Sequence, residues 1–156
     1  MVASVKRKNP KWLESVLKKQ KKLTGKVVAI GFPKGTDAVG LSYPDGTALL
    51  NVAAWNNFGT SRIPRRDFMS AGSKLMHEKT APIAKRFMKG INSGKIDADT
   101  VLRQMGVVAA GQLQIAIKDL TDPPNSPITI SMKGSSNPLV DTGLLVGSVT
   151  WVIREE

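Results

Sequence analysis

The 156-residue sequence contains no cysteine and a single histidine. Without thiols, the chain has no disulfide framework, no cysteine nucleophile and no thiolate metal site. His77 has no second histidine four residues further on, so the helical zinc-protease pattern is also missing. We therefore predict no metal site and no cofactor, and we expect His77 to be exposed or on the side of a helix.

Long apolar runs are missing as well. No stretch approaches the about 18–20 apolar residues of a membrane span, and the basic start MVASVKRKNPKW lacks the apolar core of a secretory signal. We expect a soluble protein made in the cytoplasm, with no membrane contact. A chain of 156 residues is typical of a single domain, here 1–156, that builds a sizeable core without cross-links.

The usual signatures of catalysis are absent too. Ser15 and Lys18 have the spacing found in penicillin-binding enzymes, but the companion elements are missing and the pair lies in a lysine-rich helix. The sequence contains neither of the two glycine-rich phosphate-binding motifs, GxGxxG and GxxxxGK(S/T). Turn and N-cap roles explain five acids that lie beside glycine or just before apolar helical runs: Asp45, Asp67, Asp97, Asp99 and Asp141. We predict that the chain is not an enzyme and has no catalytic residue.

Positive charge is abundant and unevenly distributed. The net charge is +11, and residues 1–26 hold nine lysine or arginine residues against one acid, Glu14. A second basic cluster consists of Arg62, Arg65 and Arg66. Such asymmetry predicts an anionic partner, either nucleic acid or an acidic protein surface, unless the lysines only solvate a helix face. The eight aromatic residues do not interleave with basic ones, so no stacking platform for nucleic acid is expected.

The first part of the chain predicts a helix, a strand and a loop. Residues 9–23 form an amphipathic helical pattern with lysines on its polar face. The β-branched run 26–32 is typical of a strand. Residues 33–47 are rich in glycine and proline, which indicates a loop or a loose hairpin. Its return arm is expected at Val39, Leu41 and Tyr43.

Capping residues then mark two helices. Thr47 is expected to cap a helix over 48–58 that stops at Gly59, with glycine in a left-handed C-cap. Asp67 is expected to cap a long helix that reaches about residue 92. Because proline lacks the N–H of the helical ladder, Pro82 should kink or split this helix.

The most regular helical pattern covers residues 97–120, with Asp97 or Asp99 as its cap. Its apolar face is wide. Small residues on it would let another helix approach closely: Gly106, Ala109, Ala110 and Gly111.

The end of the chain predicts a loop, a short turn and a strand. Residues 121–140 are rich in proline, glycine and serine around the β-capable run ITISM, which indicates a loop. Asp141 is expected to cap a single helical turn, and residues 148–154 alternate as a strand does. The predicted fold is α+β: a small, mainly antiparallel sheet packed by two long helices plus an N-terminal amphipathic helix, with long flexible loops at 33–47 and 121–140.

Two segments resemble a known family. AAWNNFGTSRIPRRDFM (53–69) ends a helix in aromatic-Gly-Thr, continues through a proline/arginine turn and opens the next helix with an aromatic residue. NPLVDTGLLVGSVTWVI (137–153) contains Pro-Leu, then Asp-Thr-Gly-Leu, then a serine before the last strand. Both resemble motifs of the tail-component family of long-tailed bacteriophages, the tail-completion or neck proteins that join head and tail. The residues that match are Trp55, Phe58, Gly59, Thr60, Pro64, Arg65, Phe68, Pro138, Leu139, Asp141, Thr142, Gly143, Leu144 and Ser148.

The resemblance implies a structural protein of the virion, assembled in the host bacterial cytoplasm. Such a protein is a subunit of a homo-oligomeric ring, commonly a hexamer, at the head–tail junction. Its partners would be copies of itself, the head-completion or connector protein, and the tail-tube or tail-terminator protein. Phage DNA would pass through the lumen with only transient, non-specific contact.

A ring needs heterologous interfaces, in which the front of one subunit meets the back of the next. The loops at 33–47 and 121–140 are candidates for such contacts, because long loops tend to be functional or disordered. Most motif residues are expected to serve the fold. The candidate interface residues are Arg62, Arg65, Arg66, Lys18, Lys19, Lys21 and Lys22.

Other functions stay open at this point. Within virion assembly, the nearest alternative is a tail-terminator ring that caps the tail tube. A basic, non-specific DNA-binding accessory protein is a different class, favoured by the N-terminal charge alone. A small enzyme is the least favoured class, because every catalytic pattern fails.

Overall fold

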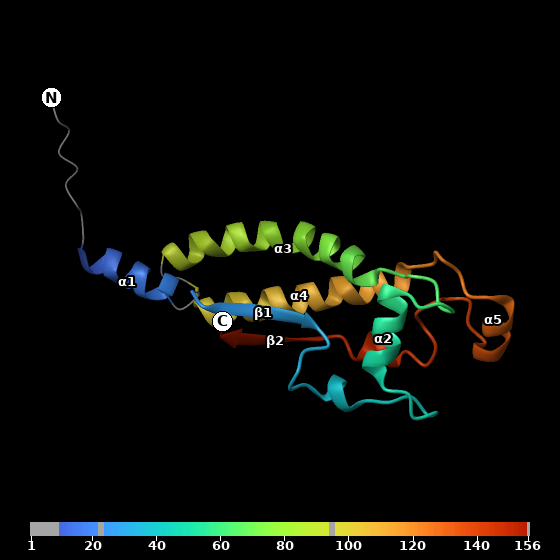
Figure 1. Cartoon of the computed structure of the whole chain (residues 1–156). Helices are drawn as coiled ribbons and strands as arrows, with labels where there is room; N and C mark the ends of the chain where they lie inside the picture. The colour runs from blue at the N-terminus through green and yellow to red at the C-terminus, as the bar shows by residue number, and fades with distance from the viewer. Residues whose placement is uncertain (1–9, 22–23, 94–95, 156) are drawn as a thin grey trace.

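The computed structural model describes residues 10–21, 24–93 and 96–155. Two long helices, α3 (Phe68–Asn92) and α4 (Ala98–Asp119), run side by side, and α4 lies between α3 and a two-stranded sheet (Figure 1). Helix α1 (Pro10–Lys21) contacts α3 at one end of this stack. The shorter helices gather at the other end (Figure 1). This arrangement confirms an α+β fold.

The sheet joins an early and a late segment of the chain. Strand β1 (Lys26–Gly31) pairs antiparallel with β2 (Thr150–Glu155), and Ile30 lies opposite Trp151. Both strands were predicted from β-branched and alternating runs and are confirmed. Within the described residues the sheet has only these two strands, because the expected return arm at Val39, Leu41 and Tyr43 does not form one.

Of the two predicted forms of the segment after β1, a loop or a loose hairpin, the structure shows the loop. It contains a 3-10 helix, η1 (Asp37–Gly40), that includes the exposed Val39. A tight turn follows, in which the Gly46 N–H donates to the Tyr43 carbonyl. Proline and glycine favour such turns over strand pairing, and the only pairing in this part of the described chain is the single bridge between Ser42 and Ala48.

Helix α4 is the centre of the molecule. Asp97 is its N-cap, and its carboxylate accepts from the Asp99 N–H at 3.0 Å. Nine residues of the helix are buried, among them Leu113 and Ile117, which are completely so. The wide apolar face is used on both sides, because α3 covers one flank and the sheet covers the other.

The small residues of α4 admit a strand where a second helix was expected. A Cβ built on Gly106 would lie 2.4 Å from the indole of Trp151, so β2 approaches α4 at this glycine. Helix α3 approaches α4 through a glycine of its own: a Cβ on Gly72 would lie 2.5 Å from the Leu113 side chain. The expectation of a close approach was correct, but the partner at Gly106 was wrong.

Helix α3 continues through Pro82 without a break, so the predicted split is wrong. Residues on both sides of the proline pack against α4, including Phe68 before it and Phe87 after it. Pro82 itself is exposed. Packing on both sides therefore outweighs the loss of one ladder hydrogen bond on the solvent side. His77 is exposed on this helix, as predicted.

Three local predictions about the shorter helices are wrong. Helix α2 (Leu49–Phe58) begins after Ala48, and no side chain caps it, so Thr47 is not the cap. Helix α6 (Leu144–Gly147) follows Gly143, whose φ of 80° reverses the chain, and Asp141 does not cap it. Residues Pro127–Lys133 form helix α5 although their β-branched side chains favour a strand.

The ends of α5 explain why it is helical. Ser126 is its N-cap, and its hydroxyl accepts from the Thr129 N–H at 3.2 Å. Pro127 occupies the first turn, where its missing N–H is harmless. Gly134 ends the helix in the left-handed conformation, with φ 68°. Among the described helices, none is long and apolar enough to cross a membrane.

The contact between Gly106 and Trp151 can be tested by one matched pair of substitutions. Gly106→Ala is expected to lower the free energy of unfolding by about 1–3 kcal/mol, because the new methyl overpacks the indole. Gly111→Ala in the same helix meets no atom within 4 Å and is expected to raise it by about 0.5–1 kcal/mol. Urea unfolding followed by tryptophan fluorescence measures both. Equal effects of the two substitutions would contradict the close approach of β2.

Candidate functional site

A buried arginine organises the end of the molecule where the short helices gather. Arg66 is only 5% exposed. Its Nε donates to the Pro123 carbonyl at 2.8 Å and its Nη1 to the Asn56 side-chain oxygen at 2.9 Å. Nη2 donates to the Pro124 carbonyl at 3.1 Å and to the Asn125 side chain at 3.3 Å. Burial lowers the pKa of Arg66, but an arginine stays charged in proteins.

The network continues from Arg66 into the last part of the chain. The Asn125 amide donates to the Asn137 carbonyl at 3.3 Å. The Asn137 side chain accepts from the Leu139 and Val140 N–H groups, both at 3.0 Å, and donates to the Lys118 carbonyl of α4 at 2.7 Å. The segments 53–69 and 137–153, which are far apart in sequence, are therefore linked through residues 123–125.

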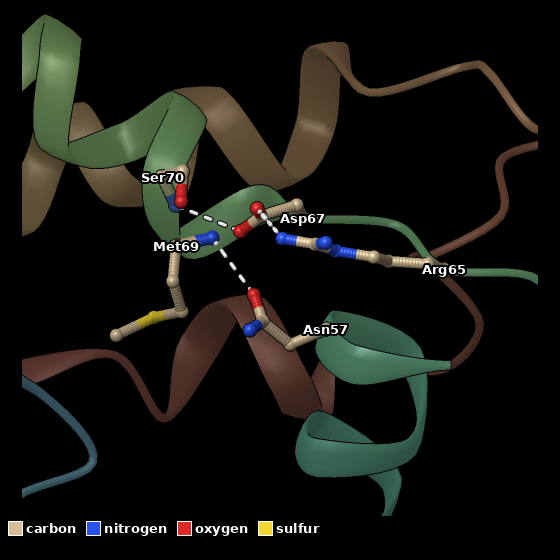
Figure 2. A network of polar contacts seen from close by, with 5 residues as sticks. All are labelled: Asn57, Arg65, Asp67, Met69 and Ser70. Carbon is tan, nitrogen blue, oxygen red and sulfur yellow. Dashed lines mark hydrogen bonds and ion pairs between the residues drawn. The ribbon is translucent and has the colours of Figure 1, made fainter. Parts of the chain in front are cut away.

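A second network holds the start of α3 against α2 (Figure 2). The buried Asn57 accepts from the Met69 N–H at 3.1 Å, and Asp67 accepts from the Ser70 N–H at 3.1 Å. Arg65 forms an ion pair with Asp67. Asp67 is thus the predicted cap of α3. The hydrogen bond from Ser70, with a smaller effect of Arg65, holds the pKa of Asp67 below its ordinary value.

Gly59 makes the sharp turn between α2 and the arginine segment possible. Its φ of 78° agrees with the predicted positive φ, but its ψ of 166° lies outside the left-handed helical region that was predicted. A Cβ at this position would lie 3.1 Å from the Arg65 backbone nitrogen. Glycine is therefore required both by conformation and by space.

Two adjoining clefts flank this arginine segment. The first has a volume of about 600 Å³ and lies between the segment and α5. Its lining is Asn56, Arg62, Ile63, Pro64, Arg66, Pro124, Asn125, Ser126, Thr129, Lys133 and Pro138. The second, of about 440 Å³, shares Asn56, Ile63, Lys133 and Pro138 with it and adds Tyr43, Trp55 and Asp141 among others.

The electrostatics of the first cleft favour an anionic partner. Its lining contains three cationic side chains and no acid. The pKa of Lys133 lies below its ordinary value, mainly because the amino group is partly buried. The neighbouring Asp141 opposes this shift, and Arg66 adds to it. The Lys133 amino group donates to the Pro138 carbonyl at 3.4 Å. The cleft therefore presents positive charge to whatever enters it. Among the described residues, no group of three or more His, Asp or Glu side chains could hold a metal ion.

The residues of the first motif divide between core and surface. Phe68 is 1% exposed and packs the core, whereas Phe58 is 74% and Trp55 42% exposed. Thr60 shapes the arginine turn, because its hydroxyl accepts from the N–H groups of Arg62 and Ile63. Pro64 is exposed.

The residues of the second motif mostly serve the fold. Pro138 and Leu139 are buried, and Leu144 packs against the main core. The Ser148 hydroxyl donates to the Leu144 carbonyl at 2.6 Å, and Thr142 accepts from the Leu144 N–H at 3.3 Å. Asp141 is exposed. Together with Gly143, these residues build the turn into β2.

The candidate interface residues fall into two separate regions. Arg62 and Arg65 are exposed beside the clefts, but Arg66 is buried in the protein, which corrects its expected surface position. A guanidinium with four carbonyl acceptors stabilises the loops instead. Lys18 and Lys21 are exposed on α1, at the opposite end of the molecule (Figure 1). The Lys19 side chain and Lys22 lie outside the part of the chain that the structure describes.

Several residues of this site were not predicted. Asn125 and Asn137 connect the motifs, and Asn57 holds α3. Each of the first two lies next to a proline, in PPNSP and SSNP. An amide beside a proline is a signal for a turn, but nothing in the sequence indicates which distant group it binds. Comparisons of the chain with models of protein families, with curated proteins and with solved structures found no match.

The Arg66 network can be tested by a conservative substitution. Arg66→Lys keeps the charge but cannot reach four acceptors in the planar geometry of a guanidinium. We expect the free energy of unfolding to fall by about 2–3 kcal/mol, because buried acceptors lose their donors. Arg65→Lys, at an exposed position, is the matched control and should change it by less than about 0.5 kcal/mol. Equal stability of both variants in urea unfolding would contradict the structural role of Arg66.

The Asp67 cap predicts a pH dependence. Because the pKa of Asp67 is lowered in the folded protein, its charge stabilises the fold above the ordinary pKa, and this contribution disappears as the pH falls through the lowered value. Asp67→Asn keeps a capping side chain but does not titrate. The wild type should be more stable than this variant at pH 7, and the difference should shrink below about pH 4. Urea unfolding at both pH values measures it; a constant difference would argue against the charged cap.

Proposed function

We propose that this protein is a structural subunit of a ring at the head–tail junction of a long-tailed bacteriophage. In this proposal it completes the neck or tail and connects the capsid connector to the tail, with DNA passing through the lumen. The observation that carries the proposal is the pair of motifs at 53–69 and 137–153, which occur in the order of the tail-component family. Its location would be the virion.

The placement of the motifs supports this reading. Both segments meet at one end of the molecule, linked through Arg66, Asn125 and Asn137. Motif residues form helix ends and turns there, and they leave Trp55, Phe58 and Arg62 exposed. An end that is held by an internal network and exposes aromatic and basic side chains suits protein–protein contacts.

The charge distribution supports a lumen that carries DNA. The net charge is +11, and lysines of α1 are exposed at the end remote from the motifs. Electrostatic contacts with phosphates are independent of base sequence and weaken steeply with salt. They would attract DNA without holding it.

Two alternatives rest on part of the same evidence. A tail-terminator ring has the same architecture and differs in position, at the end of the tail tube. A basic DNA-binding accessory protein is favoured only by the charge of residues 1–26. Tight DNA binding at ~0.2 M salt would favour this second alternative, because purely electrostatic contacts are weak there.

Disruption of the gene in a phage that carries it tests the proposal. We expect infectivity to collapse, with DNA-filled heads and tails of normal length accumulating as separate particles in electron micrographs. The intact gene supplied in trans should restore joined particles. Tails of abnormal length would favour the tail terminator, because a missing cap leaves the tube free to grow. Joined, infectious particles from the disrupted phage would refute both ring proposals.

A further inference from the structure

The cleft between the arginine segment and α5 contains positive charge that the chain itself does not compensate. Arg62, Arg66 and Lys133 line it, and no aspartate or glutamate does. Among the described residues, none of the three cations forms an ion pair. A concave surface that carries one sign of charge attracts ions of the opposite sign. The cleft therefore stabilises an anion.

Arg66 also has one hydrogen-bond donor that the chain does not use. A guanidinium has five N–H groups. In Arg66, Nε and Nη2 use three of them on residues 123–125, and Nη1 uses one on the Asn56 side chain. The second N–H of Nη1 has no acceptor within the described part of the chain. Because Arg66 lines the cleft although it is only 5% exposed, an oxygen that enters the cleft can satisfy this buried donor.

The adjoining cleft offers apolar surface next to this charge. The two clefts share a wall formed by Asn56, Ile63, Lys133 and Pro138. Beyond this wall, the second cleft has mainly aromatic and aliphatic side chains, which include Tyr43, Val52, Trp55, Leu139 and Leu145. It also contains two acids, Asp45 and Asp141. The guanidinium groups therefore lie on one side of the wall, and apolar surface with negative charge lies on the other.

We propose that the two clefts together bind an extended segment of a partner protein. An acidic side chain of this segment enters the first cleft, where Arg62, Arg66 and Lys133 donate to its carboxylate. An apolar side chain two positions away packs against Trp55 in the second cleft, since alternate side chains of an extended chain point the same way, about 7 Å apart. The inference goes beyond the proposed function, because it concerns the isolated protein and holds for any assembly to which the chain belongs.

The charges of the two clefts favour a polypeptide over a nucleic acid as the occupant. A nucleic-acid strand carries a phosphate at every nucleotide. A strand that crosses the shared wall brings its next phosphate towards Asp45 and Asp141, which repel it. A polypeptide avoids this repulsion, because an apolar residue can follow an acidic one. Cations on one side of the wall and apolar side chains on the other therefore match a short sequence that is both acidic and apolar.

A blocked synthetic peptide tests the site. It has seven residues, with glutamate at the third position, leucine at the fifth, and glycine or serine elsewhere. Titrated into the isotopically labelled full chain, it should shift the nuclear magnetic resonance signals of the Trp55 indole N–H and of the Ile63 and Thr129 backbone N–H groups. We expect saturation with a Kd below about 1 mM. Absence of saturable shifts at these groups up to about 5 mM peptide would overturn the proposal.

Two altered peptides separate the roles of the clefts. Glutamine in place of the glutamate removes the charge that the first cleft binds, and serine in place of the leucine removes the apolar side chain that the second cleft binds. Each change should weaken binding at least about tenfold. If neither change weakens binding, the side chains do not enter the clefts and the proposal is wrong.

A matched pair of protein variants checks that the cleft, and not the net charge, binds the peptide. Arg62→Gln with Lys133→Gln should weaken binding of the glutamate and leucine peptide at least about tenfold. Lys79→Gln with Arg103→Gln removes the same two charge types from exposed positions of α3 and α4 and should change it less than about twofold. None of these four side chains is buried, and urea unfolding confirms that both variants fold. Equal weakening by the two variants would contradict a specific cleft.

Inorganic phosphate and a thymidine trinucleotide with a 5′-phosphate test the other anionic occupants. Under the same conditions, we expect both to bind at the cleft at least about tenfold more weakly than the peptide. If phosphate shifts the same signals with equal affinity, the cleft takes any small anion and the assignment to a polypeptide is wrong. If the trinucleotide binds more tightly than the peptide, the occupant is nucleic acid and the proposal is wrong as well.

Discussion

The end of the molecule that carries both family-like segments depends on a buried positive charge. Arg66 binds the carbonyl groups of Pro123 and Pro124 and the side chains of Asn56 and Asn125. Three of these acceptors belong to residues 123–125, a segment with few other means of association, because proline carries no N–H and turns leave carbonyls without helical or sheet partners. A guanidinium supplies several donors in one plane, so one side chain orders the arginine turn, the start of α5 and the approach to β2.

Two neighbouring arginines, Arg65 and Arg66, have different roles in this arrangement. Arg65 points to solvent and pairs with Asp67, whereas Arg66 is buried. Sequence reasoning treated both, with Arg62, as one basic cluster, because neighbouring arginines are chemically identical in a sequence. Only the direction of the chain after Gly59 decides which of them faces the interior. That direction depends on contacts with residues 123–125, which are remote in sequence.

Predictions based on local chemistry succeeded for the caps of the two long helices and for the strands, but failed for the caps expected at Thr47 and Asp141. Asp67 and Asp97 cap the two long helices because a carboxylate just before an apolar helical run binds free N–H groups wherever the helix packs. The strands β1 and β2 followed from β-branched and alternating residues. Helix α5 was missed because intrinsic β-propensity was weighed above the serine cap, the proline in the first turn and the glycine at its end. For a short segment with no buried side chain, the ends decide the conformation.

The predictions that needed long-range information could not be made from the sequence. The glycine and alanine residues of α4 indicated that another element packs closely against this helix. Small residues allow a strand to approach as well as a helix, so the sequence did not show that Trp151 of β2 contacts Gly106. Pro82 was expected to kink or split α3, because a local pattern does not reveal that residues on both sides of it pack against α4. The clefts are likewise made by residues from separate parts of the chain.

Charge and apolar surface act against one another in any self-association of this chain. Each chain carries a net charge of +11, so bringing copies together costs electrostatic free energy that salt reduces. The exposed apolar side chains of α2 and α5 supply a driving force in the opposite direction. The exposed lysines of α1 lie at the end remote from these helices, which keeps part of the repulsion away from the apolar surfaces. Raising the salt concentration screens this repulsion and leaves the apolar term in place, so the balance between the two depends on ionic strength.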